Sequence, residues 1–330
     1  MKTLYVDTEG GDAYKIVGDA VKKYLPKISG VEYKATNHKQ TEIRHIDPFQ
    51  PDWCLTSTPL NNHSYIIKQL RNWLSVGWDL EGVYDWRRLR TTDSPNFHVV
   101  ATVDPTAQKL LTKAGHESLY LPLGFDPDVY NYQEVGDEYK CDVIMAGVMY
   151  ENRARIIKAL EPISKDIKIR TINCRHWEAK LIHYKKFIHY YHRDKIPVSE
   201  LVKYYCGAKI ILIGNRDFDP GNDQKHLGIK SQAIGRVFQE TACKQLVLVD
   251  NTRPNLKDHF KIGEEIDVFN SDEELRSKIL YYLKNEDERE AIAEAGYQRT
   301  MKENTYQHRM QTLVNYMNKN IHRIRKNFNL

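Results

Sequence analysis

The chain has 330 residues, of which 41% are hydrophobic and 28% are charged, and its mean hydropathy is −0.63. This length and composition are typical of a soluble globular protein of about two domains, and no run reaches the ~18 consecutive apolar residues of a membrane-spanning helix. The net charge of +5 is unevenly spread, because residues 136–330 carry 34 basic and 27 acidic side chains. Such a basic half favours either a polyanionic ligand or solvated basic helices.

The N-terminal segment and the cysteines predict a cytoplasmic protein. Residues 1–12 reach acidic and glycine residues after a few apolar positions, so we expect no signal peptide there. The five cysteines are widely spaced and form no CxxC pair. A zinc site or disulfide framework needs clustered spacing, so we expect reduced and mostly buried thiols.

In the first part of the chain, strand-like runs alternate with helix-like runs, a pattern typical of parallel α/β sheets. Strands are predicted over 3–7, 53–56, 98–103 and 118–121, and helices over 12–25, 65–76 and 105–114. The polar, turn-rich segment 126–138 has no clear period. It is predicted to link two domains.

The same alternation begins again after this linker. Strands are predicted over 141–146, 167–172, 208–213 and 246–249, and helices over 153–160, 198–205, 231–242, 272–284 and 288–303. We therefore expect an N-terminal Rossmann-like domain over 1–132, a C-terminal Rossmann-like domain over 133–310, and a basic C-terminal helix over 311–330.

One candidate ligand site is the turn between the strand 141–146 and the helix that follows it. Ligands of open α/β sheets bind beyond the carboxyl ends of the strands. Gly147 there lets the backbone approach a ligand, and the next helix offers free N–H groups and a positive dipole end. Arg153 in its first turn opposes the helix dipole, which favours a bound anion nearby. The side chains of Tyr150 and Asn152 lie in the same turn.

A second candidate stretch, 228–250, leads from a loop with Lys230 into a helix and then a buried strand. Arg236 and Glu240 lie four residues apart on one helix face, with Gln239 beside them. This spacing is equally compatible with a surface ion pair and with a ligand site.

Several motifs that would define other functions are missing, including a GxxxxGK[ST] phosphate loop, a GxGxxG turn, a GxSxG elbow and an HExxH helix. Two DxD-like triplets occur, at 126–128 and 217–219. Both lie in predicted loops, and we assign no metal to either.

An ordered set of segments resembles a known family. These segments are LPLGFDPDVYN (121–131), CDVIMAG and the arginine helix after it (141–153), VSELVKYYCGAKIILI (198–213), RVFQETACKQLVLVD (236–250), FKIGEEIDVFNSDEELRSKILYYLKNEDERE (260–290) and the AxxGYQR ending (293–313). Together they resemble the CgeB-like glycosyltransferases. This group is related to the group-1 sugar transferases of GT-B architecture, in which two Rossmann-like domains face each other.

The resemblance implies a nucleotide-sugar donor, usually a UDP-sugar, in the C-terminal domain. It also implies an acceptor against the N-terminal domain, transfer in the cleft between them, and a C-terminal helix that returns to the N-terminal domain. No metal or other cofactor is implied. The donor-binding residues would be Gly147, Tyr150, Asn152, Arg153, Lys230, Arg236, Gln239 and Glu240. With Arg236 in that role, we expect Arg236→Ala to reduce turnover while leaving thermal stability close to that of the wild type.

Three positions depart from the group-1 pattern. Gln239 stands where a ribose-binding glutamate is usual, Ser231 replaces an upstream glutamate, and Lys244 replaces a glycine. A glutamine amide can still hydrogen-bond a ribose. These departures keep open the alternative of a non-catalytic module that binds a nucleotide-sugar or a polyanion.

A general base for the acceptor hydroxyl is expected in loops after N-terminal strands. The candidates are Glu9, Asp12 and Asp104. Asp12 suits the alternative role of a helix N-cap equally well.

A further hypothesis concerns the acceptor. The run 183–193 interleaves aromatic and basic side chains, as single-strand nucleic-acid platforms do, although a partly exposed linker fits the same composition. Its candidate DNA-contacting residues are Lys185, Lys186, Tyr190 and Arg193. With the basic residues of 309–326, they suggest a hydroxymethylated base of DNA as a possible acceptor.

Overall fold

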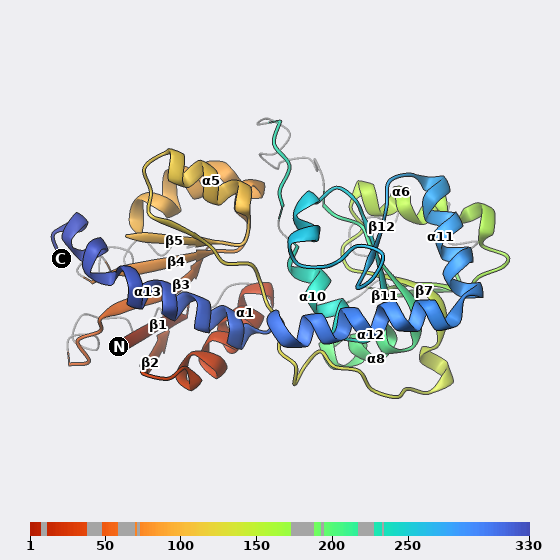
Figure 1. Cartoon of the computed structure of the whole chain (residues 1–330), viewed down its shortest axis with the longest axis horizontal. Coiled ribbons are helices and arrows are strands. Elements are labelled where there is room, and N and C mark those ends of the chain that lie inside the picture. The colour runs from red at the N-terminus through yellow and green to blue at the C-terminus, as the bar shows by residue number, and fades with distance from the viewer. Residues whose placement is uncertain are drawn as a thin grey trace. The chain divides into compact units, whose positions relative to one another are not determined.

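The fold was analysed in a computed structural model (Figure 1). It describes residues 1–7, 12–37, 48–58, 70, 73–172, 188–192, 195–216, 228–232 and 234–330. The chain forms two compact units. Unit 1 comprises Met1–Gly124, Gly221–Gly235 and Tyr306–Leu330, and unit 2 comprises Phe125–Pro220 and Arg236–Thr305.

Unit 1 is built on a parallel six-stranded sheet in the order β2-β1-β3-β4-β5-β6. The strands are β1 (Lys2–Asp7), β2 (Glu32–Asn37), β3 (Trp53–Thr58), β4 (Ser75–Asp79), β5 (Val99–Thr102) and β6 (Ser118–Tyr120). Its helices include α1 (Asp12–Tyr24), α4 (Trp86–Arg88), α5 (Pro105–Lys113) and α13 (Tyr306–Phe328).

Separate hydrophobic clusters cover the opposite faces of this sheet because successive side chains of a strand alternate. Tyr5, Leu55 and Trp78 pack with residues of α1 and α13. Val6 and Cys54, the strand neighbours of Tyr5 and Leu55, belong to a different cluster. The long α13 therefore continues the core of unit 1, as the predicted return of the C-terminal helix to the N-terminal domain requires.

Two strands of unit 1 escape prediction from the sequence. β2 carries the sequence EYKATN, which is polar at the sheet edge. β4 falls at the end of the helix predicted over 65–76, and this part of the prediction is wrong. All five of its residues are buried, because a central parallel strand is covered on both faces and shows no period-2 alternation.

Unit 2 contains a second parallel six-stranded sheet, in the order β12-β11-β10-β7-β8-β9. Its strands are β7 (Cys141–Ala146), β8 (Ile169–Ile172), β9 (Tyr190–His192), β10 (Ala208–Ile213), β11 (Leu246–Asp250) and β12 (Asp267–Phe269). Its helices include α6 (Glu151–Ala159), α8 (Val198–Cys206), α10 (Gly235–Thr241), α11 (Asp272–Lys284) and α12 (Glu286–Glu303). Residues of α6, α11 and α12 pack in one cluster with β7 and β10.

The order of strands has a switch point in unit 2, and open α/β sheets form their ligand-binding crevice at the strand ends of such a point. The chain runs from β7 outward to β8 and β9, then returns to place β10 on the other side of β7. Connections on either side of this switch point leave in opposite directions, so the carboxyl ends of β7 and β10 are where a ligand is expected to bind. Gly147 and Gly214 follow these two strand ends.

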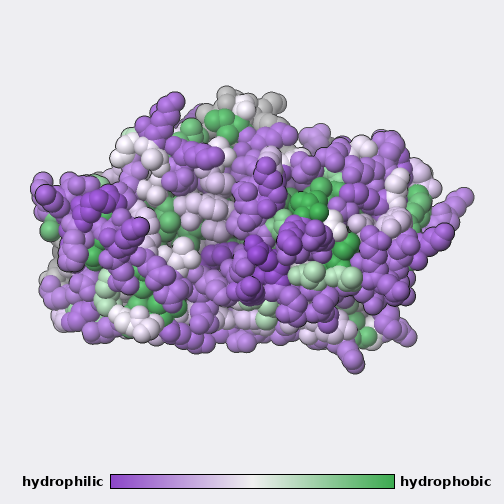
Figure 2. Space-filling view, viewed as in Figure 1, coloured by the Kyte–Doolittle hydropathy of each residue, from purple (hydrophilic) through white to green (hydrophobic). Residues whose placement is uncertain are grey.

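The surface and the thiols agree with the composition. The face shown in Figure 2 is mostly hydrophilic, with hydrophobic residues in small separate patches. Cys54, Cys141, Cys206 and Cys243 are free and buried, while Cys174 lies outside the described residues. Over the described ranges, the helices are all too short or too polar to span a bilayer.

Candidate donor-binding site

Gly147 forms the turn at the carboxyl end of β7. Its φ is +104°, in the left-handed region that favours glycine, and its N–H donates to the Ile172 carbonyl at 2.8 Å. A Cβ at this position would lie 2.9 Å from Nη1 of Arg236 and 3.1 Å from Nη1 of Arg153. The backbone angle therefore favours glycine, and the missing Cβ leaves room for two guanidinium groups.

Arg153 joins the two strand ends of the switch point. Its Nε donates to the Gly214 carbonyl at 2.8 Å, and its Nη1 donates to the Val148 carbonyl at 2.6 Å. Only 7% of the residue is exposed. Burial and the neighbouring Arg236 lower the pKa of Arg153 to about 10, so the guanidinium stays charged at neutral pH. The fixed geometry holds a positive charge in the crevice.

Arg236 reaches the same turn from α10. Its Nη2 donates to the Ala146 carbonyl at 2.9 Å and to the Tyr205 hydroxyl at 3.2 Å, and it forms an ion pair with Glu240. Burial by itself would lower the pKa of Arg236. The ion pair with Glu240 and the contact with Tyr205 raise this pKa by a larger amount, so the net shift is upward. The side chain remains 34% exposed.

The two arginines keep donors available for a ligand. Among the described residues, Nη2 of Arg153 and Nε and Nη1 of Arg236 have no hydrogen-bond acceptor. The N-terminus of α6 adds backbone donors, because its N-cap residue Tyr150 makes no side-chain capping bond. The N–H groups at the start of a helix have no partner within the helix and attract anions.

A buried polar network fixes the ends of β10 and β11 around this crevice. The Asp250 carboxylate accepts hydrogen bonds from the backbone and the side chain of Asn215 and from Asn152 Nδ2 at 2.8 Å. Asn152 also donates to the Asn215 carbonyl at 3.0 Å. Asn152 thus acts as a brace between α6 and two strands, rather than pointing at an open site.

Tyr150 contacts two cations. Its ring lies 5.3 Å from the guanidinium of Arg153 and 4.4 Å from that of Arg216, which follows β10. Cation–π contacts of this kind orient a guanidinium plane. Arg216 adds a third arginine to the edge of the crevice.

Sequence reasoning missed four residues of this site: Tyr205, Asn215, Arg216 and Asp250. For three of them, the sequence contains a pattern that could have identified them. Asn215, Arg216 and Asp250 are polar residues at or just beyond the carboxyl ends of buried strands, where ligands of parallel sheets bind. No local pattern distinguishes Tyr205, because its role comes from contacts with Glu240 and Arg236 on another helix.

The remaining predicted donor-binding residues, Gln239, Glu240 and Lys230, differ in burial and in the unit to which they belong. Gln239 is half-buried on α10, and its side-chain amide makes no hydrogen bond within the described part of the chain. The neighbouring Glu240 points inward and is 1% exposed. Lys230 is exposed and belongs to unit 1, and the helix predicted from residue 231 begins instead at Gly235.

Among the predicted acceptor-side residues, only Asp104 can be described in full. It is 0% exposed, and its Oδ1 accepts from the N–H groups of Thr106 at 2.8 Å and Gln232 at 3.2 Å. Its Oδ2 accepts from the Val83 N–H at 3.3 Å. These bonds make Asp104 the N-cap of α5 and a tie between loops. Glu9 and the Asp12 side chain lie outside the described residues.

Little of the predicted DNA-contacting run can be placed. Lys185, Lys186 and Arg193 lie outside the described residues. Tyr190 is the first residue of β9, where a linker was the alternative prediction. Of the DxD-like triplets, Asp126 accepts from the Asp128 N–H at 3.0 Å in a local turn, and 217–219 is not described.

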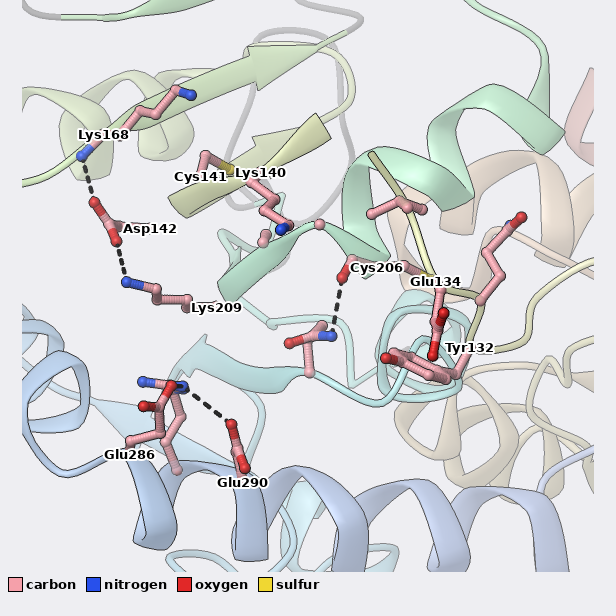
Figure 3. Close-up of a pocket in the computed structure, with 16 residues that line it drawn as sticks. Tyr132, Glu134, Lys140, Cys141, Asp142, Lys168, Cys206, Lys209, Glu286 and Glu290 are labelled. Carbon is pink, nitrogen blue, oxygen red and sulfur yellow. Dashed lines mark hydrogen bonds and ion pairs between the residues drawn. The ribbon is translucent and has the colours of Figure 1, made fainter. Parts of the chain in front are cut away.

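A cavity of about 680 Å³ lies at the opposite edge of the sheet, where β7 and β10 begin (Figure 3). Its charged side chains largely bond one another or nearby backbone. Asp142 accepts from the Lys168 N–H at 2.8 Å and pairs with Lys209 at 2.9 Å. The length of β7, roughly 20 Å, separates this cavity from Gly147, so it is not part of the arginine site.

Comparison with known proteins finds a family model that matches the part of the chain bearing the two arginines. Residues 153–315 match the sequence model of a family described as "Glycosyl transferase-like". This range begins at Arg153 and includes Arg236.

One particular relative extends this likeness over most of the chain. The spore protein CgeB of Bacillus subtilis (strain 168) is 22% identical over 319 residues, which cover 91% of this chain and 94% of CgeB. The resemblance to CgeB-like glycosyltransferases that the ordered motifs indicate is confirmed.

Solved structures show the same fold. Anabaena Alr3699/HepE, in complex with UDP-glucose, matches with a TM-score of 0.66 at 11% identity over 97% of this chain and 100% of that chain. A sucrose-phosphate synthase from Thermosynechococcus elongatus matches with a TM-score of 0.65 at 8% identity over 97% and 98% of the two chains. The predicted α/β fold with two Rossmann-like domains of GT-B architecture is confirmed.

Proposed function

We propose that this chain is a glycosyltransferase that moves a sugar from a nucleotide-sugar donor to an acceptor hydroxyl, and that Gly147, Arg153 and Arg236 bind the donor diphosphate. One observation carries this proposal: two guanidinium groups converge on a glycine turn at the switch point of the second sheet. That point of an α/β sheet is where ligands bind.

The charge of the site suits a diphosphate. Arg153 and Arg236 bring two positive charges to the glycine turn, Arg216 lies nearby against the Tyr150 ring, and Glu240 offsets one charge. The diphosphate of a nucleotide-sugar carries two negative charges, which these guanidinium groups attract. Available guanidinium donors and the uncapped N-terminus of α6 can bond its oxygens.

The chemistry of transfer explains why fixed arginines help. The bond between the anomeric carbon and the diphosphate oxygen breaks, and the electron pair leaves with the nucleoside diphosphate. The leaving group therefore gains negative charge as the reaction proceeds. Preorganised cations stabilise this charge more than they stabilise the intact donor, which lowers the barrier. We propose that arginines perform this task here without a divalent ion.

The ribose and the sugar of the donor are assigned next. The Gln239 amide, which is half-buried and unbonded within the described residues, is proposed to hydrogen-bond the ribose. We propose a UDP-linked hexose as the donor. The support for this choice is the HepE complex with UDP-glucose, whose fold this chain shares.

The acceptor remains a prediction from the sequence. The DNA hypothesis depends on basic residues around 183–193, most of which lie outside the described residues. It predicts salt-sensitive DNA binding, and binding that is absent at low salt would contradict it. The cytoplasmic location also stays a prediction.

Calorimetric titration tests the diphosphate assignment. We expect UDP to bind at least tenfold more tightly than UMP, because only UDP presents a second phosphate to the arginines. Arg153→Met should weaken UDP binding at least tenfold. Lys158→Met removes an exposed charge from the same helix and should change the affinity less than twofold. Equal affinity for UDP and UMP would contradict the assignment.

A second measurement separates an enzyme from a binding module. We expect purified protein to release UDP slowly from UDP-glucose or a related UDP-sugar, with water as the acceptor, and to do so equally well in EDTA. Tight UDP-sugar binding with no release over hours would favour the non-catalytic module instead.

A further inference from the structure

The buried carboxylate of Glu240 lies beside the arginines of the site. It is 1% exposed, and its Oε1 accepts hydrogen bonds from the Tyr205 hydroxyl at 3.0 Å and from Arg236. Its Oε2 is also buried and has no hydrogen-bond partner among the described residues. An unpaired carboxylate oxygen is costly to bury, so a stability role alone does not explain this arrangement.

Gln239 and Glu240 are neighbours on α10, but their side chains point in different directions. Gln239 lies where the group-1 pattern has its ribose-binding glutamate, and Glu240 is one residue further along the helix. A step of one residue turns a side chain by about 100° around the helix axis, and Glu240 therefore points inward. Its carboxylate contacts Arg236 and Tyr205 on the side of these groups that is buried in the protein.

The charges explain what such a carboxylate can do. Arg153 and Arg236 are close enough for Arg236 to help lower the pKa of Arg153, while Glu240 acts in the opposite direction. One negative charge thus offsets one of two neighbouring positive charges. The same charge repels any anion that binds to the exposed side of the guanidinium groups, and this repulsion is only weakly screened because Glu240 is buried.

We propose that Glu240 is an internal counter-charge that sets how tightly the site holds a nucleoside diphosphate, and so permits its release. The proposal rests on the proposed function, since it takes the diphosphate site as its starting point. A free nucleoside diphosphate carries more negative charge than the donor from which it leaves. A fixed carboxylate behind Arg236 therefore weakens product binding more than donor binding. Tyr205 holds this carboxylate in place.

The test is the affinity of Glu240→Gln for UDP. Glutamine keeps an oxygen that can accept from Tyr205 and Arg236, and its amide nitrogen replaces the unpartnered Oε2. We expect Glu240→Gln to bind UDP about tenfold more tightly than the wild type in calorimetry, with slower UDP dissociation. Inorganic pyrophosphate, used as a second probe, should show the same direction of change.

Two further variants separate charge from packing. Glu240→Asp keeps the negative charge and should bind UDP within about threefold of the wild type. Glu200→Gln is a matched control on α8, where Glu200 accepts from Tyr139 at 2.7 Å and pairs with Lys203 at 3.2 Å in a more exposed triad. It changes the net charge of the protein equally and should alter UDP affinity less than twofold.

The outcomes are distinguishable. Unchanged or weaker UDP binding by Glu240→Gln overturns the role of Glu240 while leaving the diphosphate site standing. Failure of the wild type to bind both UDP and pyrophosphate overturns the proposed function, and this inference with it. Should Glu240→Gln not fold alone, millimolar UDP is expected to restore its cooperative melting transition. Failure to restore it would also overturn the inference.

Discussion

Arg153 and Arg236 bring like charges to the same glycine, and each would lie about 3 Å from a Cβ at position 147. Arg153 comes from the helix that follows the turn, and Arg236 comes from a helix almost 90 residues later in the chain. Two cations so close together repel each other, and within the described ranges the buried Glu240 is the carboxylate that pairs with Arg236. Such an arrangement costs stability without a ligand and is typical of a site built for an anion.

Gly147→Ala should therefore damage the site directly. The left-handed φ strains any residue with a Cβ, and the new methyl group must displace the Arg236 guanidinium. We expect at least a tenfold loss of UDP affinity and a loss of about 1–3 kcal/mol in the free energy of unfolding. Calorimetry and urea denaturation measure both. Gly263→Ala also has a positive φ but no neighbour within 4 Å of its Cβ. It should lose stability and keep its affinity for UDP.

Arg236→Met should reduce stability as well as UDP affinity, which revises the expectation from the sequence alone. Removal of the guanidinium leaves the buried Glu240 carboxylate without its ion-pair partner. We expect a loss of about 2–4 kcal/mol in the free energy of unfolding. The double variant Arg236→Met/Glu240→Gln should recover at least half of that loss and bind UDP at least tenfold more weakly than Glu240→Gln alone. If Arg236→Met unfolds with the same free energy as the wild type, the buried Glu240 carboxylate does not need its ion-pair partner for stability.

Asp104→Asn should behave as a structural change. An amide group cannot accept all the N–H bonds that the carboxylate receives from Val83, Thr106 and Gln232. We expect a loss of about 1–3 kcal/mol in the free energy of unfolding, with UDP affinity within about twofold of the wild type. Wild-type stability with lost sugar transfer would instead return Asp104 to the list of catalytic candidates.

The contact of α13 with unit 1 should depend on pH. Arg323 donates to both oxygens of Glu117, at 2.8 Å and 2.6 Å, and Tyr316 donates to the same carboxylate. These bonds lower the pKa of Glu117, chiefly through Arg323. Because the folded pKa is the lower one, the stabilisation is present above the unfolded pKa of about 4.3 and is lost as pH falls through the folded pKa.

Glu117→Gln tests this dependence. We expect it to lower the free energy of unfolding by less than about 1 kcal/mol at pH 7, since Arg323 is half exposed. The difference from the wild type should be smaller at pH 3, below the unfolded pKa, and should vanish once the pH is low enough to protonate Glu117 in both states. Urea denaturation at the two pH values measures it. A difference that persists unchanged at pH 3 would show that the ion pair is not its cause.

Parts of the site could be predicted because their causes are local or follow from sheet topology. Gly147 and Arg153 follow a strongly hydrophobic strand, and a parallel sheet places such a turn at its ligand-binding edge. Arg236 and Glu240 were recognised as a pair because four residues make one helical turn. The direction in which each side chain points was not predictable. It depends on which face of α10 packs against the sheet and against Tyr205.

The sequence by itself determined the alternation of strands and helices, the resemblance to sugar transferases and the chemistry available at the strand ends, since these depend on order and composition along the chain. Only the tertiary structure decided that Asp104 is a buried cap, that Glu240 lies on the buried side of Arg236, and that Asn152 braces α6 against Asn215 and Asp250. These roles come from contacts between residues far apart in sequence. Burial then decides whether a carboxylate is open to a ligand or bonded within the protein, and no local pattern records burial.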